Sequence, residues 1–99
     1  MTHARVWKFR PPAGHEAEFE KAYSGVGNWA KLFDQAPGYC GTVLLRPSEK
    51  GGWWLTIDRW ETEAHFEAFK HDFGVQYRGL DREMEGVAGE ELFVGAFEE

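Results

Sequence analysis

The chain has 99 residues, with five Trp, eight Phe and three Tyr, and a formal net charge of −6. This length fits one domain, residues 1–99, and the singly scattered basic residues form no face that would displace counterions from nucleic acid. The acidic balance and the lack of an apolar run of about 18 residues argue against any binding to a membrane.

The first predicted element is a strand over His3–Arg10, where the residues alternate between two faces with a period of two. The prolines that follow end the strand because proline has no N–H to donate to a ladder. A helix is predicted from about Gly14 to Ser24, with its apolar residues at helical spacing. Two glycines interrupt it, and Asn28 is the predicted N-cap of a second short helix that carries Trp29 and Phe33.

Two further strands are predicted over Tyr39–Arg46 and Trp53–Trp60, joined by a hairpin loop. Thr62 is the predicted N-cap of the main helix, in which Gly74 and Gly79 predict a kink or a close packing contact. The apolar stripe of this helix recurs at steps of three or four residues: Phe66, Phe69, Phe73, Tyr77, Leu80 and Met84.

After a predicted loop over Gly86–Gly89, a last strand is expected over Leu92–Phe97. The order βαββαβ predicts an α+β ferredoxin-like fold, in which a four-stranded antiparallel sheet is covered by helices on one face. The other face would then include an aromatic row of about 600–1,000 Å²: Trp7, Phe9, Trp54 and Trp60. Soluble monomers rarely expose an apolar patch of that size, so the sequence predicts a homodimer in which two such sheets pack together.

Cys40 is the only cysteine, which excludes an intrachain disulfide. The first residues lack the apolar stretch of a signal peptide, so the expected location is the cytoplasm. A metal site needs ligands that converge at short spacing, and His65 and His71 are too far apart along their helix to share a face. We therefore predict no metal and no other cofactor.

Three runs of the sequence resemble the antibiotic-biosynthesis-monooxygenase-like proteins of the dimeric α/β-barrel superfamily: Gly27–Phe33, Pro37–Tyr39 with Gly41-Thr42, and Leu55–Glu61. The most telling feature is a strand that ends in Trp60-Glu61 and passes at once into a helix with a Phe stripe. The resemblance implies a dimeric α/β barrel with its ligand between the sheet and the helices, near Trp60. Relatives include cofactor-independent oxygenases of polyketide phenols and haem-degrading enzymes, and a shared fold does not fix which activity a member has.

The resemblance also bears on individual positions. Oxygenase members have Asn four residues before the tryptophan that Trp60 matches, and this chain has Thr56, which can donate one hydrogen bond. The positions that match the three haem-site residues of the haem-degrading members are Trp7, Phe69 and Gly79. None of the three carries the residue of those enzymes, so haem degradation is not expected.

Asp58 lies between Thr56 and Trp60 on one strand face, so all three can meet one ligand. A carboxylate beside aromatic rings loses hydration and has a raised pKa, which suits it to take a phenol proton. The alternative is a structural ion pair between Asp58 and an arginine such as Arg5 or Arg59, across the sheet or across the dimer.

His71, on the flank of the main helix, is a second candidate base or proton shuttle, and the alternative is a histidine that faces solvent. Thr56 is the candidate polar anchor for a ligand, and Trp54, Trp7 and Phe69 are the candidate walls. The sequence therefore predicts a homodimer that binds a planar aromatic or quinone-like metabolite, with Trp60, Asp58 and His71 as catalytic candidates of a cofactor-independent monooxygenase. The alternative function is a non-catalytic binding or stress-related module, and a cavity of about 300 Å³ or more would favour the enzyme or binder.

Overall fold

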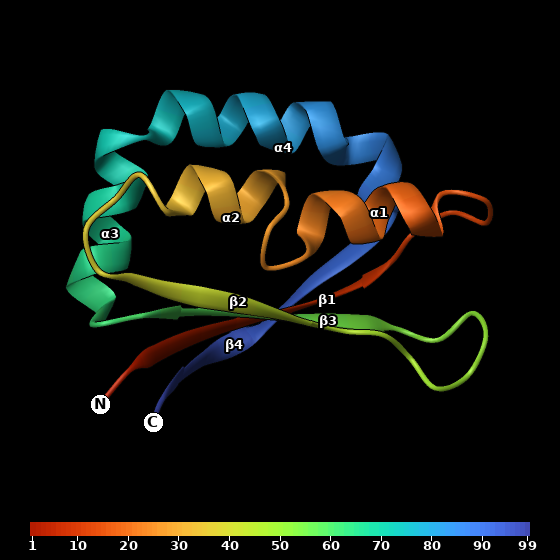
Figure 1. The fold of residues 1–99 in the computed structure, drawn as a ribbon, viewed down its shortest axis with the longest axis horizontal. Helices are drawn as coiled ribbons and strands as arrows, with labels where there is room; N and C mark the ends of the chain where they lie inside the picture. The colour runs from red at the N-terminus through yellow and green to blue at the C-terminus, as the bar shows by residue number, and fades with distance from the viewer.

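A computed structural model describes residues 1–99 as a four-stranded sheet with helices on one side of it (Figure 1). The strands are β1 His3–Arg10, β2 Tyr39–Leu45, β3 Trp54–Trp60 and β4 Glu90–Glu98. The helices are α1 Glu16–Tyr23, α2 Asn28–Phe33, α3 Glu63–Asp72 and α4 Gly74–Ala88. All neighbouring strands are antiparallel in the order β2-β3-β1-β4, which confirms the predicted ferredoxin-like arrangement.

The predicted main helix is two helices, because the chain leaves α-helical geometry at Phe73, between α3 and α4. A break beside Gly74 agrees with the predicted kink, whereas Gly79 lies inside α4. Thr62 is the N-cap of α3, as predicted, and its hydroxyl accepts a hydrogen bond from the backbone N–H of His65 at 3.2 Å. The first two helices occupy their predicted regions, and the N-cap of α2 is Gly27, one residue before the predicted cap.

The predicted loop over Gly86–Gly89 is wrong, because α4 continues to Ala88. Val87 and Ala88 are buried in the core, and this tertiary packing outweighs the low helix propensity of the glycine before them. Gly89 ends the helix with φ +65°, and a Cβ at this position would collide with the carbonyl oxygen of Arg10. The helix therefore ends where only glycine fits.

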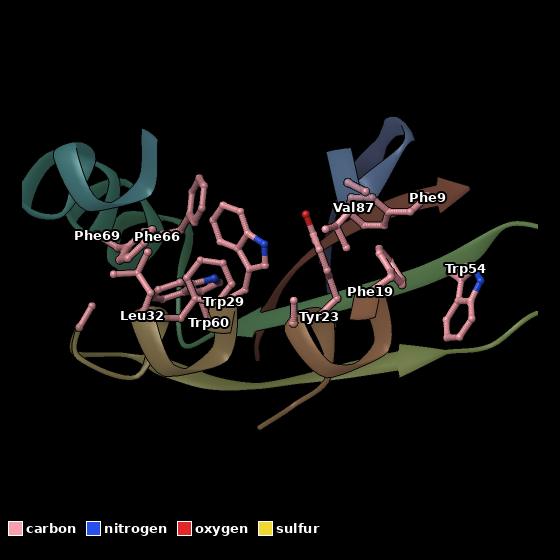
Figure 2. Packing of buried hydrophobic residues seen from close by; sticks show 14 residues of the cluster. Phe9, Phe19, Tyr23, Trp29, Leu32, Trp54, Trp60, Phe66, Phe69 and Val87 are labelled. Carbon is pink, nitrogen blue, oxygen red and sulfur yellow. The ribbon is translucent and has the colours of Figure 1, made fainter. Parts of the chain in front are cut away.

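The predicted placement of the aromatic row on the uncovered sheet face is also wrong. The register pairs Phe9 with Trp54 and Trp7 with Thr56, and these side chains share the face that the helices cover. Phe9, Trp54 and Trp60 are buried in the core (Figure 2). The aromatic row faces the helices because the apolar stripes of the helices must be buried against large side chains. The uncovered face instead carries exposed apolar side chains: Val43, Leu45, Leu92 and Phe97.

One end of the layer between sheet and helices is filled by rings around Trp60, whose side chain is completely buried. The centroid of its ring lies 5.3 Å from that of Phe69, 5.7 Å from Phe33 and 5.8 Å from Phe66. Tyr39 adds a fifth ring at 5.3 Å. We call these five residues the Trp60 cluster. No helix of the protein combines the length and apolar character that crossing a bilayer requires.

Candidate functional site

A cavity of about 120 Å³ lies between the sheet and the helices, next to the Trp60 cluster. This volume is below the roughly 300 Å³ at which size alone would favour an enzyme or binder, so support for that function must come from the groups that line the cavity. Both layers contribute to its wall, since residues from all four strands and from α1, α2 and α4 line it. The eleven lining residues are Trp7, Phe9, Tyr23, Trp29, Phe33, Thr42, Thr56, Asp58, Tyr77, Asp81 and Glu91. Six of them are hydrophobic and three are carboxylic acids, so the cavity combines aromatic walls with negative charge. Asp81 and Glu91 are exposed and lie at its mouth.

Asp58 is held by a short chain of hydrogen bonds that runs along the sheet. The hydroxyl of Thr42, its neighbour in register on β2, donates to Asp58 Oδ1 at 2.7 Å. The hydroxyl of Tyr39 lies 2.5 Å from Thr42 Oγ1. A threonine hydroxyl has a single hydrogen, and Thr42 gives it to the carboxylate. Tyr39 is therefore the donor to Thr42 while Asp58 is ionised, and the direction of the whole chain is fixed.

Burial raises the pKa of Asp58 to about 6, and the hydrogen bond from Thr42 and the positive charge of Arg5 offset only part of this rise. Within one chain, Asp58 forms no ion pair with either arginine, although Arg5 is its partner in register on β1. The Arg5 guanidinium stacks on Phe66 at 3.9 Å from the ring centroid, and Arg59 Nε donates to Glu99 at 2.8 Å. Asp58 is thus a carboxylate without a paired cation in an aromatic cavity, a setting in which a carboxylate can accept a proton near neutral pH.

The mouth of the cavity has its own electrostatic character. Burial, followed by the charges of Asp81 and Glu85, raises the pKa of Glu91. Burial and then Asp81 raise the pKa of the Tyr77 hydroxyl, and burial also raises that of Tyr23. The wall contains no Lys, Arg or His to balance these acids.

A buried indole nitrogen lies behind the wall, next to Tyr23. Trp29 is only 8% exposed, and its Nε1 has no hydrogen-bond partner. Figure 2 shows this nitrogen on the edge of the indole ring that is turned toward Tyr23, another wall residue. Burial raises the pKa of the Tyr23 hydroxyl, and the interaction with this nitrogen offsets part of the rise. The nitrogen has no surface open to the cavity, so it is not offered to a ligand.

The structure brings together three of the residues that the sequence analysis selected, because Thr56, Asp58 and Trp7 all line the cavity. Trp60 and Trp54 do not line it and belong to the buried core. The indole of Trp60 is enclosed by the other members of its cluster, which leave it no surface for a ligand.

Phe69 and His71 also lie away from the cavity. Phe69 is 1% exposed and packs within the Trp60 cluster. The side chain of His71 is 89% exposed and its Nδ1 lies 3.0 Å from Asp72, which corresponds to the solvent-facing alternative. No three His, Cys, Asp or Glu side chains are grouped so that they could hold a metal ion.

Asp81, Glu91 and Trp29 were missed as site residues. Asp81 follows Tyr77, a member of the predicted apolar stripe, by four residues and therefore lies on the same helix face. This spacing could have indicated that Asp81 faces the sheet side of the helix. Glu91 pairs with Phe9 across β1 and β4. That register depends on where α4 ends, so the incorrect loop over Gly86–Gly89 concealed it.

The comparisons with known proteins agree on the fold. The family model described as antibiotic biosynthesis monooxygenase matches residues 2–72. The sequence has no significant match among curated proteins. A point mutant of SnoaB, a cofactor-independent oxygenase from Streptomyces nogalater, is 20% identical with a TM-score of 0.79, over 99% of this chain and 92% of that one.

Two heme-related structures are also similar to this chain. A point mutant of MhuD with two manganese protoporphyrin IX bound per active site is 23% identical with a TM-score of 0.71, over 98% of this chain and 93% of that one. A heme-degrading protein from Mycobacterium tuberculosis is 23% identical with a TM-score of 0.61, over 99% and 93%. At such identities the likeness establishes the fold, and chemistry must be argued from the cavity.

Proposed function

This chain belongs to the antibiotic biosynthesis monooxygenase family, and we propose that it is a cofactor-independent oxygenase that converts a small phenol into a quinone in the cavity around Asp58. The observation that carries the proposal is the position of Asp58, an unpaired carboxylate in an aromatic wall with its pKa raised to about 6. A phenol has a pKa near 10, so this rise brings the base about two units closer to the acid it must deprotonate.

The proposed reaction needs no reductant besides the substrate. A phenol with a free para position reacts with one O₂ to give a para-quinone and one water. The phenolic O–H and the para C–H bond break, one oxygen atom becomes the new carbonyl, and the other leaves as water with both hydrogens. The ring supplies all four electrons that O₂ accepts. Asp58 takes the phenolic proton at the start and returns it to the departing oxygen, so the base is ready for the next cycle.

The other wall residues have positioning roles in this proposal. Thr56 faces the same cavity as Asp58 and would anchor a ring oxygen through its hydroxyl. Trp7 and Phe9 form an aromatic surface, with 6.3 Å between their ring centroids, against which a planar ring can stack. Orientation and exclusion of water are the contributions of the protein, since the chemistry proceeds between substrate and oxygen.

An oxygen-electrode assay with 3-ethylphenol tests the proposal. We expect oxygen uptake above a protein-free control, with the quinone appearing in equal amount. Asp58→Asn should lower the rate by about 100-fold or more while phenol binding is retained. His71→Asn is the matched control, because His71 is exposed and outside the cavity. Binding without oxygen uptake would instead support the alternative, a non-catalytic binding module.

We also propose that the protein works as a homodimer that buries the uncovered sheet face. Val43, Leu45, Leu92 and Phe97 are 40–52% exposed on this face, and a self-complementary contact would cover such a patch. Light scattering should then give about twice the chain mass of 11.4 kDa. Val43→Lys should shift the protein toward monomer, whereas Val26→Lys, at an exposed position outside the sheet, should not. A monomeric wild type would refute this part of the proposal.

Haem degradation is not part of the proposed function. The cavity of about 120 Å³ is small for a macrocycle, and Trp7, Phe69 and Gly79 replace the residues that the resemblance associates with haem. Hemin and a reductant should therefore cause no loss of the Soret band beyond that of a protein-free control. Stoichiometric binding of hemin followed by decay of the band would contradict this expectation.

A further inference from the structure

The cavity limits the size of a ligand. Its volume of about 120 Å³ is close to that of an engineered apolar cavity of about 150 Å³ that binds benzene. One aromatic ring therefore fills the space between the sheet and the helices. Any longer substituent must extend toward the mouth, where Asp81 and Glu91 are exposed.

The charge of the wall indicates which substituent fits. Three carboxylic acids line the cavity with no basic side chain among them. Neither Asp81 nor Glu91 forms a salt bridge, and burial together with the charge of Asp81 raises the pKa of Glu91, so the two negative charges at the mouth are close together and unpaired. A bound cation would relieve this repulsion and would also be attracted by the aromatic faces of Trp7 and Trp29. An anionic substituent would add to the repulsion.

A second, independent observation concerns the other end of a ligand. Thr56 is 4% exposed and lines the cavity, and its hydroxyl makes no hydrogen bond within the protein. A buried hydroxyl needs a partner, and the oxygen of a phenol or an ether can accept its hydrogen. The wall thus offers one donor for a ring oxygen and two exposed acids for a cation.

From these features we propose that the ligand is a single-ring phenol that carries an alkylammonium group, with the ring inside the cavity and the ammonium at the mouth beside Asp81 and Glu91. The proposal specifies the substrate class of the oxygenase proposed above and rests on it. The selectivity comes from charge, so compounds of equal size and different charge must be distinguished.

Calorimetric titration under nitrogen, where no oxygen can be consumed, measures this selectivity. The three probes are 3-(2-aminoethyl)phenol, 3-ethylphenol and 3-(3-hydroxyphenyl)propionate, which present a positive, a neutral and a negative substituent on the same ring. We expect the amine to bind roughly tenfold more tightly than the neutral phenol, and the acid to bind most weakly. The preference should shrink at high salt, because the mouth is open to solvent.

The double variant Asp81→Asn/Glu91→Gln should reduce the preference for the amine to less than about threefold, with no loss of melting temperature, because both residues are exposed. The matched control is Glu67→Gln/Glu83→Gln. It changes the net charge equally at exposed helical positions outside the cavity, so it should keep the full preference.

The outcomes separate this inference from the function on which it rests. If 3-ethylphenol or the acid binds as tightly as the amine while 3-ethylphenol still drives oxygen uptake, the charge selectivity is refuted and the oxygenase proposal survives. If none of the three probes gives heat of binding and none drives oxygen uptake, both proposals are refuted.

Discussion

The Trp60 cluster and the cavity around Asp58 are neighbours in one layer, yet one is filled and the other is open. Trp60 and Asp58 are two residues apart on β3 and point to the same sheet face. Over Trp60, α3 places Phe66 and Phe69, whose rings leave no free space. Over the cavity, α4 supplies residues with polar ends, among them Asp81. The residues of the covering helices, more than those of the strand, determine which end is core and which can bind a ligand.

The largest effect on stability is expected in the Trp60 cluster. Trp60→Ala removes a fully buried indole and should lower the free energy of unfolding by about 3–5 kcal/mol. Trp53→Ala is the matched control, since Trp53 lies at the end of the hairpin loop and is only partly buried. Its cost should stay near 1 kcal/mol, because it mainly loses cation–π contacts with Lys8 and Arg10. Urea unfolding measures the free energy of unfolding of both variants. Equal losses would contradict the expectation that Trp60 is part of a tightly packed cluster.

In the cavity, removing the negative charge of Asp58 should stabilise the protein. The folded-state pKa of Asp58 is about 6, above the ordinary value near 4, so between these values the folded chain binds more protons than the unfolded chain. Stability therefore falls as pH rises through this window, and the cost persists at pH 7. Asp58→Asn should recover about 1–3 kcal/mol at pH 7 and almost nothing at pH 3.5. Urea unfolding at the two pH values checks this, and a loss of stability at pH 7 would contradict it.

The smallest effect concerns the hydrogen bond that Thr42 donates to Asp58. This bond favours the ionised carboxylate, so Thr42→Val should raise the pKa of Asp58 and move the acid limb of the oxygen-uptake profile upward by about one pH unit. Wild-type activity should fall as pH decreases through about 6, because the protonated acid is no base. Thr56→Val is the control, since Thr56 makes no hydrogen bond to Asp58. The midpoint of the acid limb of the oxygen-uptake profile should not move in this variant.

Period-two alternation was enough to predict part of the cavity. It placed Thr56 and Asp58 on one strand face, and the pairing of β1 with β3 adds Trp7 to the same face. Trp60 was selected because the resemblance placed the ligand near it. Alternation puts it on the same face, but cannot tell whether the helix above contributes a phenylalanine or an acid. His71 was selected from its position on a helix flank, and it lies in solvent because α3 turns its aromatic residues toward the sheet.

The fold was more predictable than the face assignments. Turn residues and periodicity predicted every strand to within two residues at each end. They did not indicate which sheet face the helices cover, since both faces of β3 carry large apolar residues, such as Ile57 on one and Trp54 on the other. Tertiary packing determines the covered face, because the aromatic row is the one that can fill the space beneath the helices and pack against the phenylalanines of α1, α2 and α3.

The hydrogen-bond chain from Tyr39 through Thr42 to Asp58 has a spectroscopic consequence. Tyr39 also borders a surface groove of about 530 Å³ with Cys40 and Gly41. Burial raises the pKa of its hydroxyl to about 12, so it stays protonated in ordinary buffers. When Asp58 gains a proton, Thr42 no longer has to donate to it, and the bond from Tyr39 can reverse. The ring carbon that bears the Tyr39 hydroxyl would then change its chemical shift. An isotope label at this carbon thus serves as a reporter on the protonation of Asp58 that leaves the cavity free of any probe.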